Sequence, residues 1–136
     1  MDMGKQFSPT DPVHRIMAWP VVSVPEGATL RRLSQVLDEE RIGAALVITD
    51  TGEPGIVTEV DVVAALAADA DPDEVWSGDV MTTELVTVRS DSPIIEAAEA
   101  MHENRIRHVL VQEAGECVGL VSIRDILAVL LGHVEE

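Results

Sequence analysis

The sequence Gly-Ile-Val-Thr-Glu-Val-Asp at residues 55–61 recurs as Gly-Leu-Val-Ser-Ile-Arg-Asp at residues 119–125, which lies 64 positions further along the chain. The same shift of 64 positions aligns residues 16–66 with residues 80–130 without a gap. Thirteen of these 51 pairs are identical, whereas composition alone would give about three or four. The chain therefore contains a tandem duplication, and a site built by one copy is expected to occur twice.

The first copy predicts the element order β-α-β-β-α. Residues 20–24 predict a short strand, and Thr29 provides a hydroxyl that can cap the following helix. The near-continuous apolar run at residues 44–48 and the segment 55–57 predict two strands joined by a turn. A closing helix is expected from Glu59 to about Ala68. The apolar positions of the first helix recur at helical spacing and are Leu30, Leu33 and Leu37.

The second copy repeats this order of elements. Ser92 is the expected helix cap, with Pro93 in the first helical position. Both central helices are expected to end at the matched residues Arg41 and Arg105. The closing helix should run from Ile123 to about Leu131. Its expected buried stripe is Ile123, Ile126, Leu127, Leu130 and Leu131.

These elements predict an α/β fold of the α+β type, in which the two β-α-β-β-α copies pack as a pseudo-twofold pair. The expected divisions of the chain are a disordered tail at residues 1–12, a first copy at 13–68, a solvated acidic linker at 69–79 and a second copy at 80–136. A chain of 136 residues is long enough for a hydrophobic core and too short for two large independent domains.

The bulk composition excludes several kinds of partner. A net charge of −16 argues against nucleic acid and anionic membranes, and 2% aromatic residues leave few platforms for base stacking. The chain has no apolar segment near 18 residues, and its start lacks the apolar stretch of a signal peptide. The single cysteine, Cys117, cannot form an internal disulfide. We expect a cytoplasmic protein.

The repeated strand-to-helix junction has two interpretations. A hydroxyl followed three residues later by an acid is a helix-capping box, formed by Thr58 with Asp61 and by Ser122 with Asp125. The same arrangement suits a nucleotide. The free amides of a helix start and the cap hydroxyl can bind phosphate, and the aspartate can accept hydrogen bonds from a ribose diol. The residues alone favour the capping box only slightly.

The duplicated β-α-β-β-α order, the opening Asp79-Val-Met81-Thr82 and both Gly-x-x-(Thr/Ser)-x-x-Asp junctions resemble a CBS-domain pair, also called a Bateman module. The resemblance covers nearly the whole chain beyond the N-terminal tail. In that family, the pair holds AMP, ADP, ATP or S-adenosylmethionine. The resemblance implies that Val22 and Val86 line the base pocket. It also implies that Asp61 and Asp125 bind the ribose and that Thr58 and Ser122 bind the phosphate.

The two copies differ where the resemblance places phosphate. The second copy has the basic residues Arg107 and His108, with Arg124 in the helix start. The first copy has Gly43 and Ala44 at the matched positions and a carboxylate, Glu59, at its helix start. We therefore expect the second copy to bind the ligand more strongly.

The leading functional hypothesis is a stand-alone regulatory module that senses an adenosyl compound and passes its state to an unidentified partner protein. The alternative is a structural or protein-interaction module with degenerate sites. An enzyme is not expected, because no nucleophile elbow surrounds Ser122 and no metal-ligand spacing involves Cys117 or the histidines. No cofactor is required. We expect a homodimer whose contact includes Leu130 and Leu131.

Overall fold

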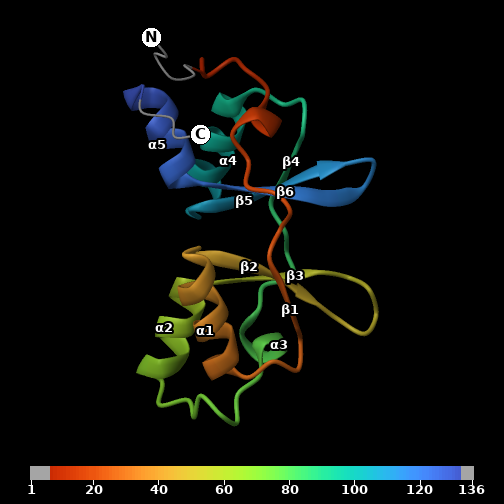
Figure 1. Ribbon diagram of the computed structural model, residues 1–136, viewed down its shortest axis with the longest axis vertical. Coiled ribbons are helices and arrows are strands. Elements are labelled where there is room, and N and C mark those ends of the chain that lie inside the picture. The colour runs from red at the N-terminus through yellow and green to blue at the C-terminus, as the bar shows by residue number, and fades with distance from the viewer. Residues whose placement is uncertain (1–6, 133–136) are drawn as a thin grey trace. The chain divides into compact units, whose positions relative to one another are not determined.

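The computed structural model describes residues 7–132 and divides the chain into two compact units (Figure 1). Val22–Leu85 form the first-copy unit. Val86–Glu136 form the second-copy unit together with Met1–Val21, so the start of the first copy belongs to the unit of the second. Each unit contains one three-stranded sheet and helices, which confirms the α+β fold and the predicted β-α-β-β-α order.

The first-copy unit is built on the sheet β1-β2-β3 (Ser23–Pro25, Ala44–Ile48 and Gly55–Thr58). β1 and β2 are parallel, and the connection between them is α1 (Leu30–Glu40); β3 then returns antiparallel to β2. A parallel pair requires such a crossover, which an apolar helix face can pack against the sheet. The closing helix α2 (Glu59–Ala67) follows β3 without a loop.

The second-copy unit repeats this topology. Its sheet is β4-β5-β6 (Thr87–Arg89, His108–Glu113 and Glu116–Ser122), with β4 parallel and β6 antiparallel to β5. The helices are α4 (Ile94–Asn104) and α5 (Ile123–Leu131), which lie on the same face of the sheet (Figure 1). None of the helices in residues 7–132 has the length and apolarity needed to cross a membrane.

The segment before each copy completes the sheet of the other copy. Ala18 pairs with Leu120 of β6 through two backbone hydrogen bonds of 2.8 and 3.0 Å. Thr82 pairs with Ile56 of β3 in the same way, at 2.8 and 2.9 Å. These contacts are related by the 64-residue shift, so the duplication seen in sequence also relates the connections between the copies.

Side chains from these segments enter the cores. Val13 of η1 (Val13–Arg15) is fully buried in the second-copy unit, and Met17 lies against Gly119. In the first-copy unit, Met81 lies against Gly55. Each glycine leaves the space that its methionine occupies, since a Cβ at either glycine would overlap the methionine side chain.

The predicted divisions at residues 1–12 and 69–79 need correction. The backbone carbonyls of Pro9 and Asp11 accept hydrogen bonds from the start of α4, so the described part of the predicted tail is ordered; residues 1–6 lie outside the described residues. The predicted acidic linker runs into α3 (Ser77–Val80), and Ser77 is fully buried with its hydroxyl donating to the Ala28 carbonyl at 2.9 Å. Both segments pack because each supplies hydrogen bonds and core surface to a unit.

The helix boundaries at Thr29, Arg41 and Arg105 are confirmed. Thr29 caps α1 by accepting from the Arg32 amide at 3.1 Å, and both arginines end their helices in the left-handed conformation. The prediction that Ser92 caps α4 is wrong. Pro93 is the residue before α4, and the Ser92 hydroxyl instead accepts from the Arg89 amide at 3.2 Å.

The predicted buried stripe of α5 is also partly wrong. Ile126 and Val129 are buried, and Ile123 is half-buried. Leu127, Leu130 and Leu131 are exposed instead. A nine-residue helix that packs on one side of a small sheet has room to bury only one narrow face.

We predict that Gly119→Ala lowers the free energy of unfolding by about 1–3 kcal/mol, because the added methyl would lie 2.7 Å from Cγ of Met17 in a packed core. Gly27→Ala is the matched control, since no atom lies within 4 Å of its added methyl. Urea unfolding measures both variants. Equal stability of the two variants would contradict the docking of Met17 on β6.

Candidate functional site

The structure places all the predicted residues of the second copy except Val86 at or beside the point where β6 runs into α5. His108 is the register partner of Ser122 across the β5–β6 pair. The Ile123 amide, first in α5, donates to the Arg107 carbonyl at 2.8 Å. Arg107 and Arg124 are exposed, and His108 is half-buried. Three basic residues therefore surround one strand-to-helix junction in a protein with a net charge of −16.

A complete capping box closes this junction. The Asp125 amide donates to Ser122 Oγ at 3.3 Å, and the Ser122 amide donates back to Asp125 Oδ2 at 2.8 Å. The Ser122 hydroxyl also donates to Asp125 Oδ2, at 3.0 Å. The structural interpretation of the motif is thus confirmed.

The first copy has the same box. The Asp61 amide donates to Thr58 Oγ1 at 3.4 Å, while the amide and hydroxyl of Thr58 donate to Asp61 Oδ2 at 2.8 and 3.1 Å. The Glu59 amide donates to the Gly43 carbonyl at 2.9 Å, which matches the Ile123–Arg107 bond. The backbone at the two junctions is therefore equivalent, and the copies differ in charge.

The cap hydrogen bonds determine which atoms of the junction remain available to a ligand. All the cap hydrogen bonds to Asp125 end on Oδ2, so a diol could bond to Oδ1 without breaking the cap. The Ser122 proton is already donated to Asp125, so a phosphate oxygen would have to compete for it. Two of the first three amides of α5, those of Ile123 and Asp125, already have acceptors. The helix start thus offers fewer free amides than we expected from the sequence.

The two predicted base-pocket valines lie in matching places. The Val22 carbonyl accepts from the Leu46 amide at 2.9 Å, and the Val86 carbonyl accepts from the Leu110 amide at 3.1 Å. Both valines are half-buried and directly precede the first strand of their sheet. Each sheet therefore presents its valine and its capping box within one unit.

The sequence did not predict a cavity of about 390 Å³ in the first-copy unit. None of the predicted site residues lines it. The cavity depends on the way in which the segment before the second copy docks on the loop after β1, and no residue pattern in the sequence indicated this contact. Its lining residues are Glu26, Gly27, Trp76, Gly78, Asp79 and Met81.

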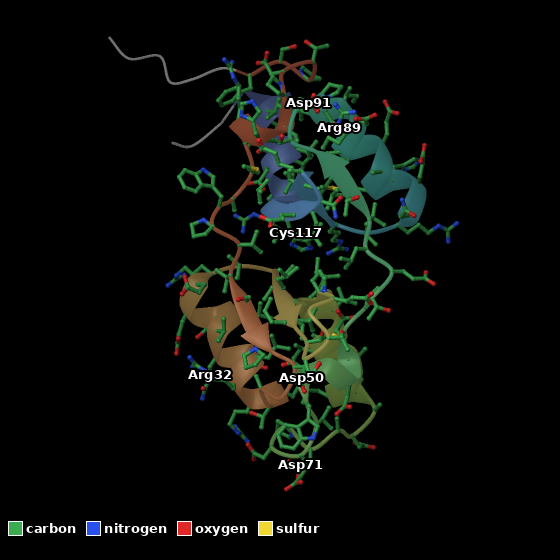
Figure 2. The ribbon with its side chains drawn as sticks, turned by 90° about the vertical axis from the view of Figure 1, so that its right-hand side faces the viewer. Arg32, Asp50, Asp71, Arg89, Asp91 and Cys117 are labelled. Atoms are coloured by element: carbon green, nitrogen blue, oxygen red, sulfur yellow. The ribbon has the colours of Figure 1, made fainter. Side chains whose placement is uncertain are left out.

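The remaining titratable features lie away from both junctions. Burial raises the pKa of the half-buried Cys117 thiol, which lies on β6 (Figure 2). Arg31 hydrogen-bonds Asp73 at 2.7 Å and holds the pKa of that exposed carboxyl below its usual range. Residues 7–132 contain no group of three or more His, Cys, Asp or Glu side chains placed to hold a metal ion.

The comparison with known families agrees with the duplicated fold and its two junctions. A model of the CBS domain matches residues 13–68 and, a second time, residues 77–132. The chain belongs to the CBS domain family. Both matches include the segment before the first strand, which in the structure docks on the other copy.

Several proteins are similar to this CBS-domain pair. The uncharacterized protein MK0525 of Methanopyrus kandleri is 32% identical over 114 residues, which span 79% of this chain and 58% of that relative. The CBS domain protein PAE2072 from Pyrobaculum aerophilum, solved in complex with AMP, is 33% identical with a TM-score of 0.79, and the match covers 90% of this chain and 97% of that one. A hexameric CBS-CP12 protein from bloom-forming cyanobacteria is 28% identical with a TM-score of 0.78, over 85% of this chain and 69% of that one.

We predict that Ser122→Ala and Thr58→Ala each lower the free energy of unfolding by about 0.5–2 kcal/mol, since each leaves a first-turn amide without its acceptor. Ser34→Ala, inside α1, is the control. Its hydroxyl bonds the Leu30 carbonyl within the helix, and alanine is the better helix former, so stability should not fall. Thermal unfolding followed by circular dichroism checks all three; an unchanged midpoint for Ser122→Ala would contradict the cap.

Proposed function

We propose that this chain is a regulatory module that binds an adenosyl compound and transmits the bound state to a partner protein. CBS-domain pairs are generally regulatory, non-catalytic modules, which favours the same role here. The observation that supports the ligand class most strongly is the AMP complex of the Pyrobaculum relative, because that relative matches nearly the whole chain. AMP is therefore the first ligand to test, with ADP, ATP and S-adenosylmethionine as the further members of the class.

The proposed binding roles follow from the chemistry at the second junction. Asp125, an acceptor through Oδ1, would take the ribose hydroxyls, and Val86 would contact the base. Ser122, Arg107, His108 and Arg124 would take the phosphate. Charge-assisted hydrogen bonds of this kind contribute about 1.5–3 kcal/mol each, which is enough to offset the competition from the cap for the Ser122 proton.

The first copy would be the weaker site on the same reasoning. Thr58, Asp61 and Val22 repeat the cap, the acceptor and the apolar position. The exposed Glu59 replaces an uncharged residue, Ile123, at the helix start and would repel a phosphate. We propose one high-affinity adenine nucleotide per chain, with the first copy empty or holding a less charged adenosyl compound.

A structural module without ligand is the second candidate. The specific observation in its favour is that each hydroxyl and carboxylate of the two junctions already bonds its partner within the cap. The net charge of −16 also opposes phosphate binding in general. In that case the pair would hold an assembly together and show no response to adenosyl compounds.

AMP at about 100 times its dissociation constant should stabilise the wild-type protein by about 2.7 kcal/mol, which raises the melting temperature by a few degrees. Adenosine and inorganic phosphate, tested separately, show which part of the ligand is recognised. A melting temperature that no member of the adenosyl panel changes would favour the structural module.

Arg107→Ala should weaken AMP binding by tenfold or more in titration calorimetry, because it removes a charge-assisted contact to phosphate. Arg89→Ala is the matched control: Arg89 is an exposed arginine of the same unit, and it pairs with Asp91 at 2.9 Å at the end of β4 (Figure 2). Asp125→Ala should abolish binding. Affinity that survives Arg107→Ala and Asp125→Ala but is lost in Thr58→Ala would show that the first copy is the site.

We also propose that the chain forms a homodimer. The hexameric CBS-CP12 relative shows that a CBS protein can assemble with itself. Leu130 and Leu131, the residues predicted for the contact, are exposed at the end of α5. Burial of exposed leucines against a second apolar surface is favourable, and a twofold contact is the commonest closed arrangement of two identical chains.

A further inference from the structure

Backbone hydrogen bonds hold the walls of the cavity in the first-copy unit. Its lining residues come from the loop after β1 and from the segment around α3 (Figure 1). The Gly78 amide donates to the Glu26 carbonyl at 2.9 Å, and a Cβ on Gly78 would lie only 3.1 Å from Cβ of Glu26. The adjacent Ser77 amide donates to the Ala28 carbonyl at 2.7 Å. The cavity is therefore preformed, as most small-molecule sites are.

Two carboxylates line this cavity without a basic partner. Glu26 is half-buried and Asp79 is exposed. Neither forms an ion pair within residues 7–132. The Trp76 amide donates to Asp79 Oδ2 at 3.0 Å, so a ligand could bond Oδ1 without breaking this contact. In a protein with a net charge of −16, two unpaired carboxylates in a cavity favour a cation.

The cavity also offers an aromatic and an aliphatic surface. Trp76 is 44% exposed and Met81 is half-buried, and both line the cavity. The face of an indole attracts an organic cation, and a methionine side chain adapts to apolar ligands. A metal ion would use neither surface, and residues 7–132 contain no group of three or more side chains placed to hold one. The lining therefore favours an organic cation.

The second-copy unit repeats the backbone contact with different side chains. The His14 amide donates to the Ser90 carbonyl at 3.1 Å, in the place of the Gly78–Glu26 bond. Docking of the segment therefore requires neither the carboxylates nor the indole. The matched positions hold Ser90 for Glu26, Arg15 for Asp79 and Pro12 for Trp76. The acids and the tryptophan are thus a feature of the first-copy unit alone, which indicates a role separate from docking.

We propose that this cavity binds a small primary alkylammonium ion. The ammonium group donates to the carboxylates of Glu26 and Asp79, since it carries several N–H donors and no acceptor. The alkyl part lies against Trp76 and Met81. None of the residues proposed for the adenosyl sites lines the cavity, and the two ligands are opposite in charge. The proposal is therefore independent of the adenosyl function.

Nuclear magnetic resonance of the nitrogen-labelled full chain tests this site. n-Butylammonium chloride, added at constant ionic strength, should shift the indole signal of Trp76 and the amide signals of Gly78 and Asp79 to saturation. The indole signal of Trp19, which does not line the cavity, should not move; a Trp19→Phe variant assigns the two indoles. n-Butanol has the chain without the charge, and ammonium chloride has the charge without the chain. Each should bind more weakly than n-butylammonium.

Two substitutions that remove charge locate the contact. Glu26→Gln and Asp79→Asn should each weaken n-butylammonium binding by about three- to tenfold, because each removes a charge-assisted bond and keeps the shape of the side chain. Glu40→Gln is the matched control. It removes one charge at an exposed position in the last turn of α1 and should leave the affinity unchanged. The spectra themselves show whether each variant is folded.

The other outcomes overturn the proposal in distinguishable ways. A Trp76 signal that does not shift to saturation would show that the cavity binds no alkylammonium ion. Equal binding of ammonium chloride or of n-butanol would reduce it to a counterion site or to an apolar one. Unchanged affinity in both Glu26→Gln and Asp79→Asn would place the binding elsewhere. Tighter binding of Nα-acetyl-lysine amide would assign the cavity to a lysine of another protein instead of a free amine. A chain that fails to bind AMP would overturn the adenosyl function and leave this proposal standing.

Discussion

The fold depends on the contact between each sheet and the segment that precedes the opposite copy. Ala18 bonds to Leu120, and Thr82 bonds to Ile56, through paired backbone hydrogen bonds. A methionine beside each bond fills the space that a glycine leaves. Each sheet is therefore completed by a segment that precedes the other copy in the sequence, within one compact unit. Burial of an apolar side chain such as Val13 contributes about 1.5–3 kcal/mol to the stability of the unit in which it packs.

Much of the architecture could be predicted because the residue pattern of each element occurs twice in the sequence. The caps at Thr58 and Ser122 were evident from local spacing, and local hydrogen bonds do form them. The docking of residues 13–21 was missed because it depends on a partner surface far away in sequence. The exposure of Leu127 was also missed, since a leucine that faces the core and one that faces solvent have the same hydropathy.

In the proposed function, the same junction residues meet a structural and a binding requirement. A capping box orients Asp125 and holds Oδ2, which leaves Oδ1 for a ligand in a fixed direction. A preorganised acceptor of this kind needs little reordering when a diol binds. The proposed preference for the second copy rests on charge, because the backbone of the two junctions is the same while Arg107 has glycine as its counterpart at position 43. The position of the candidate site could therefore be predicted from the sequence. Only the structure shows that its hydroxyls and carboxylates already bond each other within the caps.

Amide hydrogen exchange with and without AMP tests the central claim most directly, because it locates binding on the chain without any substitution. The account predicts that AMP slows exchange of the amides from Ser122 to Asp125 and around Arg107, while those from Thr58 to Asp61 change little. Slower exchange confined to residues 58–61, or no change at either junction with AMP at saturating concentration, would contradict it.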